Sequence, residues 1–228
     1  SFNQESFTSY GKSQGDNAPV SEQAAFPCTT VLNHLLRRGE HNRQRLQIGD
    51  TSIVFWAEAA DGQEAEQAVR AESLLADLLD DRPSDDQEAA RIRIELEKVQ
   101  KGRPLSDIDP RLEEDTRMYV LGLAPNASRI SIRFWEVGTL GLFARRLAEH
   151  AQDFHLEPVP WKTAPSAYRV VLATAPHREG SAPKMDDAMS NLVGEFMRAV
   201  LTGRPYPRSL LANELMRMRS DGQLSGLR

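Results

Sequence analysis

The pattern of hydrophobic and polar positions predicts one strand and one separate β-hairpin. Residues 51–57 (TSIVFWA) are rich in β-branched and aromatic side chains and follow the turn signal Gly49-Asp50, which is typical of a strand. The apolar segments 116–123 and 128–137 lie on either side of the turn sequence APNA, so we expect them to pair as a hairpin.

The second strand of this hairpin alternates in polarity, and successive side chains of a strand point to opposite faces. We expect an apolar face formed by Ile130, Ile132 and Phe134. We expect a polar face formed by Arg129, Ser131, Arg133 and Trp135. The polar face has two interpretations: a stacking platform for nucleic-acid bases with positive charge around it, or the solvated side of an ordinary sheet.

Apolar spacings of three and four residues predict helices around these strands. They cover approximately residues 21–38, 64–80, 87–101, 139–151, 185–202 and 208–220. Ser21 is the expected N-cap of the first helix, and Pro27 should kink that helix or delay its start. The segment 165–175 is ambiguous, but its Pro-Ser entry and alanines favour a helix. The order of elements predicts an α+β fold: a small antiparallel sheet with flanking helices and a helical C-terminal third.

Composition describes a soluble globular protein, with 40% hydrophobic and 27% charged residues. The single cysteine, Cys28, excludes an internal disulfide and favours a reducing compartment. No apolar run approaches the ~18 residues that a membrane span requires, and no signal peptide is visible. We therefore expect a cytoplasmic protein without a membrane partner.

The net charge of −5 conceals a strong local asymmetry. Residues 58–88 hold eleven acidic and two basic residues, whereas residues 37–45 hold four arginines and only one acid. The arginines are Arg37, Arg38, Arg43 and Arg45. Arginine suits phosphate because its planar guanidinium can bind two oxygens at once. The cluster therefore predicts an anion-binding connection between a helix and a strand, unless these arginines pair with the acidic helices of the same chain.

A polar loop near the start of the chain offers a second set of candidate contacts. Gly11-Lys12-Ser13 resembles the end of a phosphate loop, but Ser6 stands where the first glycine is needed and no hydrophobic strand precedes it. This excludes the nucleotide-binding interpretation. Lys12, Gln14 and Asn17 remain as side chains that suit base edges or phosphates, and the alternative is an ordinary surface loop.

The search for catalytic or metal-binding motifs predicts neither an enzyme nor a cofactor. His150, Asp153 and His155 are close in sequence, but the two histidines are five residues apart, so one helical face holds both poorly. There is no second cysteine for a zinc site and no GxSxG nucleophile elbow. We expect no catalytic residues, no metal and no cofactor.

Four long phrases follow one another along the chain: SFNQESFTSYGKSQGDNAPVSEQAAF, NRQRLQIGDTSIVFWAE, TRMYVLGLAPNASRISIRFW and LTGRPYPRSLLANELMRMRSDG. In this order they resemble the central part of the large subunit of the type I-C CRISPR surveillance complex, Cascade, nearly end to end. Members of that family are longer in both directions, so we expect this chain to be a piece of a longer protein.

The resemblance implies a non-catalytic DNA-recognition subunit of the prokaryotic cytoplasm. Such subunits read the protospacer-adjacent motif in duplex DNA, stabilise the displaced strand and recruit a helicase-nuclease in antiviral defence. The implied partners are guide RNA, target double-stranded DNA, the Cascade backbone and small subunits, and the helicase-nuclease. Combined with the loop, the arginine cluster and the strand face described above, this role leads us to expect nucleic-acid binding by Lys12, Gln14, Asn17, Arg37, Arg38, Arg43, Arg45 and Arg133.

The same resemblance implies a domain division. Residues 1–50 would end an N-terminal DNA-recognition domain, residues 51–160 would form a central α+β domain, and residues 161–228 would lead to a C-terminal helical bundle. The alternative from another functional class is a protein-interaction scaffold, in which the basic cluster docks an acidic partner and the sheet binds another subunit without direct DNA contact.

Overall fold

The computed structural model describes residue 11 and residues 20–39, 42–60, 62–79, 86–127, 129–158, 165–176 and 183–220. The chain forms two compact units, Ser1–Gly39 and Glu40–Arg228. The division into three domains with boundaries at residues 50 and 160 was drawn from the family resemblance, and it stays a prediction.

The first unit contains helix α1, Glu22–Leu35. The Ser21 side chain accepts a hydrogen bond from the backbone N–H of Ala24, which confirms Ser21 as the N-cap. Pro27 lies inside the helix, so it does not delay the start. The helix ends at Leu35, before Gly39.

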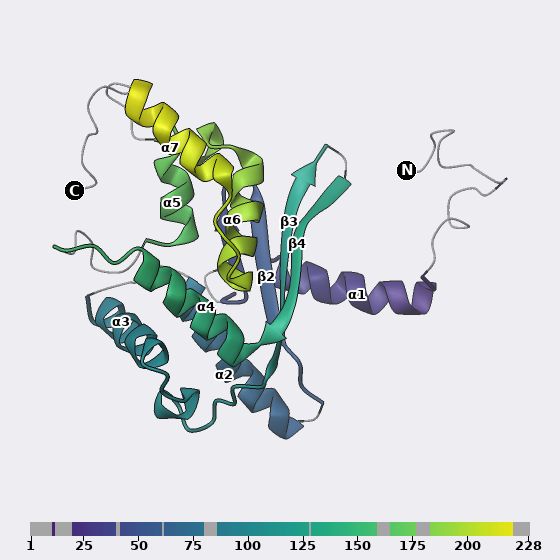
Figure 1. Cartoon of the computed structure of the whole chain (residues 1–228). Helices are drawn as coiled ribbons and strands as arrows, with labels where there is room; N and C mark the ends of the chain where they lie inside the picture. The colour runs from purple at the N-terminus through teal and green to yellow at the C-terminus, as the bar shows by residue number, and fades with distance from the viewer. Residues whose placement is uncertain are drawn as a thin grey trace. The chain divides into compact units, whose positions relative to one another are not determined.

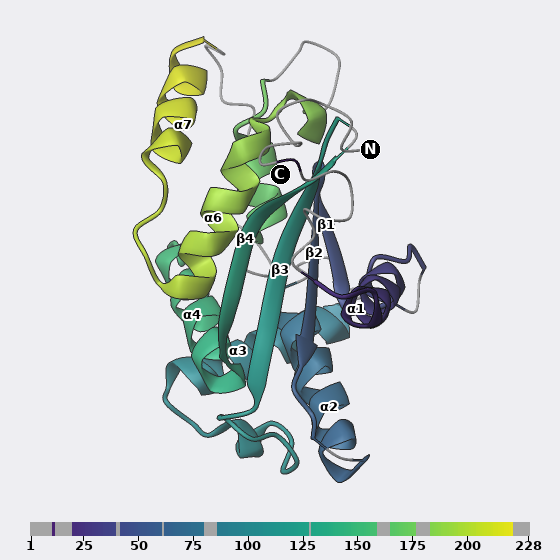
Figure 2. The same cartoon turned by 90° about the vertical axis from the view of Figure 1, so that its right-hand side faces the viewer.

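The second unit is built around a four-stranded antiparallel sheet in the order β1-β2-β3-β4 (Figure 2). Its strands are β1 (Arg45–Ile48), β2 (Thr51–Ala57), β3 (Arg117–Asn126) and β4 (Arg129–Thr139). The predicted strand 51–57 and the predicted hairpin are confirmed. Sequence reasoning missed β1, which pairs with β2 through the turn at Gly49, where φ is 58°.

A β-bulge in β4 overturns the predicted faces of that strand. Leu123 pairs with Ile132 and Gly122 pairs with Phe134, so Arg133 lies between two paired positions. The extra residue reverses the alternation: Ile132 is 67% exposed, whereas Phe134 is 3% exposed. Ile130 and Ile132 therefore share a face with Trp135, while Arg133 shares the opposite face with Phe134. Periodicity alone could not detect this reversal.

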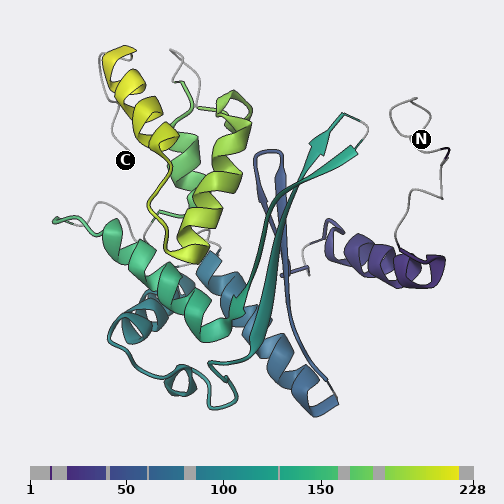
Figure 3. The ribbon, with the colours of Figure 1, turned by 45° about the vertical axis from the view of Figure 1, so that its right-hand side comes forward.

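The helices of the second unit are mainly amphipathic and cover one face of the sheet. They are α2 (Gly62–Leu79), α3 (Asp86–Gln100), α4 (Leu140–Asp153), α5 (Ala167–Ala173), α6 (Ser190–Thr202) and α7 (Arg208–Ser220), with short 3₁₀ turns η4 (Leu105–Asp107) and η5 (Met185–Asp187). Figures 1 and 3 show α3 to α7 on one side of the strands. The elements α2, α4 and α6 contact the sheet directly.

The core lies between these helices and the sheet. Its largest fully buried side chains include Phe55, Leu75, Met118, Leu140, Phe143 and Phe196. The helical C-terminal part, including the ambiguous segment 165–175, agrees with prediction, and the α+β class is confirmed. Within the described ranges, no helix has both the length and the apolar character needed to cross a membrane.

Candidate nucleic-acid interface

The predicted contact residues fall into three structural groups. Lys12, Gln14 and Asn17 lie outside the described residues. Arg37 and Arg38 belong to the first unit, and Arg43 and Arg45 belong to the second. The cluster that is continuous in sequence is therefore divided between two units.

Arg37 and Arg38 follow the end of α1 and are both exposed. The backbone N–H of Arg37 donates to the carbonyl of His34 at 3.2 Å, which closes the last turn of the helix. The Arg38 side chain makes no hydrogen bond or ion pair with any described residue. Both guanidinium groups of this short basic segment therefore lie at the surface.

Arg43 is held by an acidic helix of the same chain. It donates a hydrogen bond to Asp77 of α2, and Arg91 of α3 donates to the other carboxylate oxygen at 2.7 Å. The Asp77 residue is 8% exposed, so its charge is removed from solvent and requires cationic partners. Arg43 is thus part of the packing of α2 and α3, as the intramolecular interpretation expected.

Arg45 lies on β1 and is hydrogen-bonded along the hairpin. It donates to the side-chain oxygen of Gln47 and, at 3.2 Å, to the hydroxyl of Ser52. Ser52 in turn donates to Gln47 at 2.8 Å. The network ties the two strands of the hairpin together and orients the guanidinium.

Arg133 lies on the helix-covered side of the sheet. It donates to the side-chain oxygen of Asn191 at 2.8 Å, and its other terminal nitrogen is 3.6 Å from a carboxylate oxygen of Asp50. Its side chain is 22% exposed. The bulge therefore makes Arg133 a link between β4, the start of α6 and the β1–β2 turn, and separates it from Trp135.

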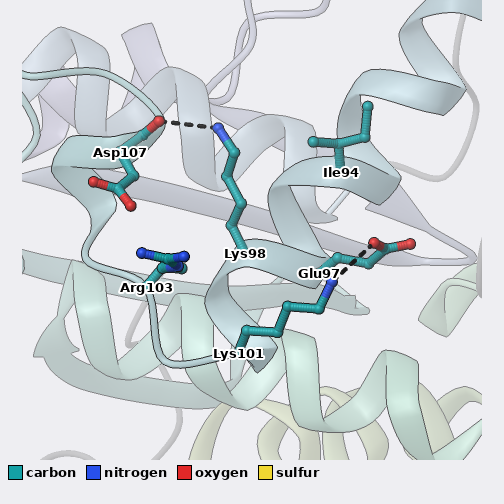
Figure 4. Close-up of a pocket in the computed structure, with 6 residues that line it drawn as sticks. All are labelled: Ile94, Glu97, Lys98, Lys101, Arg103 and Asp107. Carbon is teal, nitrogen blue, oxygen red and sulfur yellow. Dashed lines mark hydrogen bonds and ion pairs between the residues drawn. The ribbon is translucent and has the colours of Figure 1, made fainter.

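A basic pocket at the end of α3 was not predicted. Figure 4 shows Lys98, Lys101 and Arg103 around this surface pocket of about 480 Å³. Lys98 donates to the carbonyl of Asp107 at 2.9 Å, and Lys101 lies 3.6 Å from Glu97. Lys98 lies in the last turn of α3, where a cationic side chain is favourable in any helix, so the sequence gives no separate signal of its convergence with Arg103.

The candidate catalytic histidines do not form one site. His155 pairs with Glu157 at 3.6 Å, whereas His150 is buried and its Nδ1 lies 2.8 Å from the Tyr206 hydroxyl. Tyr206 donates to Asp153 at 2.9 Å. Its single hydroxyl proton is used in that bond, so Nδ1 of His150 carries the proton that it donates to Tyr206.

The surroundings of His150 are apolar and aromatic. The rings of Phe154, Phe196 and Tyr206 lie around it with centroids 4.9, 5.6 and 5.8 Å away. Burial lowers the pKa of His150 from 6.5 to about 4, against smaller opposing contributions from the Pro165 carbonyl and Asp153. Burial, together with the bond to Asp153, raises the pKa of Tyr206. The cluster is a hydrogen-bonded part of the core.

No group of three or more histidine, cysteine, aspartate or glutamate side chains converges on a possible metal position within the described ranges. The one cysteine, Cys28, is exposed on α1.

The fold and these side chains define an α+β protein that carries separate basic surfaces, one in the first unit and one at the end of α3. The family of CRISPR-associated proteins described as Cas_Csd1 matches residues 1–228, so the chain belongs to that family. This confirms the family resemblance drawn from the sequence. A comparison with curated proteins found no match.

Proposed function

We propose that the chain acts as a non-catalytic large subunit of a type I-C Cascade complex. In this role it recognises the protospacer-adjacent motif, stabilises the displaced DNA strand and recruits the helicase-nuclease. Guide pairing supplies most of the sequence specificity in such complexes, so the protein needs only a short motif contact and contacts to the backbone. Membership of the Cas_Csd1 family over the whole chain supports the proposal.

The observation that carries the DNA-contacting part is the exposed pair Arg37 and Arg38. We assign the phosphate contact to this pair. Arg43, Arg45 and Arg133 are engaged with Asp77, Gln47 and Asn191, and we assign to them mainly a structural role. Strand exchange between DNA and guide is nearly balanced energetically, so a few phosphate contacts are enough to favour it.

Replacing Arg37 and Arg38 together with alanine should weaken DNA binding by the assembled complex and flatten its salt dependence. Each lost contact to B-DNA phosphate lowers the slope of log affinity against log salt by about 0.9. We expect a slope change of about 1 to 2. Binding of the complex to target duplex at a series of salt concentrations measures it.

Two controls separate this contact from general effects. Arg93 and Arg145 are exposed, and their side chains bond to no described residue, so the double alanine variant removes the same charge elsewhere. Arg43→Ala should lower stability by about 1 kcal/mol, because Asp77 keeps only Arg91, and should leave the slope unchanged. Equal slope losses in both double variants would contradict the assignment.

A second prediction concerns Lys12, Gln14 and Asn17, which we propose as motif-reading residues. If they contact base edges, alanine substitutions should reduce discrimination between target and altered motifs, with each lost bidentate contact reducing it by about 1–3 kcal/mol. Competition binding with duplexes that differ only in the motif measures this. Uniform weakening on all duplexes would show backbone contact instead.

A further inference from the structure

The exposed side of β4 carries a continuous row of large apolar side chains, which we name the β4 stripe. Its members are Ile130 (63% exposed), Ile132 (67%), Trp135 (47%) and Val137 (43%). The bulge brings all of them to the face opposite the helices of the second unit. Adjacent exposed apolar residues of this size commonly mark an interaction surface.

The stripe is confined to the edge of the sheet. On the same face, Val54 of β2 and Leu121 and Leu123 of β3 are buried, so the face is exposed mainly along β4. Among the strands that the structure describes, β4 has only β3 as a neighbour. The pairing of β3 with β2 ends at Leu123, whereas β3 and β4 stay paired as far as Asn126 and Arg129. Figures 1 and 3 show this end of the β3–β4 ribbon diverging from β2. Edge strands of this kind are usually protected or used for pairing with another chain.

An aromatic cluster gives the stripe a preformed centre. Trp56 and Tyr119 stack with ring centroids 5.4 Å apart, and Trp135 lies 5.5 Å from the first ring and 5.9 Å from the second. The three rings come from three adjacent strands, which fixes their spacing. Rigid aromatic side chains lose little conformational entropy on binding and frequently dominate the energy of protein interfaces.

One end of the stripe is strongly acidic. Tyr119 donates to Glu58 at 3.1 Å, and Glu58 lines a surface pocket of about 240 Å³. The acidic side chains of this pocket are Glu58, Glu64, Glu113 and Asp115. Among the described lining residues, Arg117 is the one cationic side chain, and it lies 3.8 Å from Glu58. The pocket is therefore incompletely neutralised.

We infer that the β4 stripe binds an apolar segment of another protein of the complex, whose lysine or arginine end occupies the acidic pocket beside Glu58. Charge complementarity selects this occupant. Nucleic acid would be repelled by the pocket carboxylates. In antiparallel pairing with a second copy, the described tip of the opposite ribbon offers one cationic side chain, Arg129, to the four acidic side chains of this pocket. The inference rests on the proposed place of the chain in a complex, but not on the DNA contact assigned to Arg37 and Arg38.

Photo-crosslinking from position 132 tests this inference. The chain carrying p-benzoylphenylalanine at Ile132 would be purified with the other proteins of its CRISPR system and with guide RNA, then irradiated. We expect crosslinks to one segment of one other protein, apolar and with a lysine or arginine at one end. The same label at Leu211, which is 63% exposed on α7, should not reach that segment. Crosslinks to nucleic acid, to a second copy, or to nothing would overturn the inference.

Two substitutions test the apolar and charged parts separately. Ile132→Lys should reduce incorporation of the chain into the complex about tenfold, as expected for the loss of an apolar anchor. Asp115→Lys should reduce it less, and the reduction should shrink at high salt. Asp115 is exposed, and its side chain bonds to no described residue. The Asp115→Lys variant should therefore keep the fold of the parent chain. Leu211→Lys is the matched control. Normal incorporation of the Ile132→Lys variant into the complex would contradict the inference. The salt dependence of DNA binding by the Arg37 and Arg38 variant tests only the DNA contact.

Discussion

Replacing Gly122 with alanine should lower the free energy of unfolding of the second unit by about 3 kcal/mol. A Cβ at this position would lie 2.3, 2.6 and 2.8 Å from three ring atoms of Phe134. Phe134 is 3% exposed and belongs to the core, so its ring has no free space to enter. The two residues are cross-strand partners beside the bulge, and the ring covers the glycine.

Urea unfolding monitored by circular dichroism measures this loss. Gly62→Ala is the matched control, because nothing lies within 4 Å of its Cβ position, and it should be neutral or slightly stabilising. Adding Phe134→Leu to the Gly122→Ala variant should recover part of the stability, which a double-mutant cycle would detect. An unchanged unfolding midpoint for Gly122→Ala would show that the Phe134 ring relocates without cost.

The second large effect is a loss of stability as the pH falls from about 6.5 to about 4. Burial lowers the pKa of His150 from 6.5 to about 4 in the folded state. Between these values the unfolded chain binds a proton that the folded chain does not. The contribution of neutral His150 is therefore complete above pH 6.5 and lost as the pH falls towards 4, by about 3 kcal/mol in total.

Other groups titrate in the same range, so the test compares variants. His150→Phe keeps an aromatic ring among Phe154, Phe196 and Tyr206 but has no proton to bind. Its unfolding free energy should change less between pH 6.5 and 4 than that of the parent chain. His155→Gln removes a more exposed histidine and is the matched control. Parallel curves for the parent and His150→Phe would refute the proposed coupling.

Local sequence patterns were sufficient to predict most of the helices and strands. The β-branched run 51–57 and the helix 208–220 are found where their patterns predict them. The strand β1 escaped detection because it has only four residues, and its apolar positions Leu46 and Ile48 alternate with the polar residues Arg45 and Gln47. Arg45 also belongs to the basic cluster, so this short alternation does not stand out in the sequence. The segment is recognised as a strand only through its pairing with β2.

Whether a predicted nucleic-acid-binding side chain is engaged within the protein depends on residues that are distant in sequence. The sequence shows four arginines together, but Asp77 lies 34 positions after Arg43, and no local pattern indicates that they pair. The faces of β4 depend on where the strand shifts against β3, which is a property of the pairing of two strands. Long-range pairing also brings Trp56, Tyr119 and Trp135 together.

The sequence by itself determined the α+β class, most element boundaries and the family, because these depend on local periodicity, turn residues and continuous phrases. Tertiary structure alone decided which charges remain available and which apolar residues stay exposed. A side chain's neighbours come from segments far apart in the chain, and a single bulge reverses which face a residue occupies. The exposed pair Arg37 and Arg38 and the β4 stripe are therefore visible only in the folded protein.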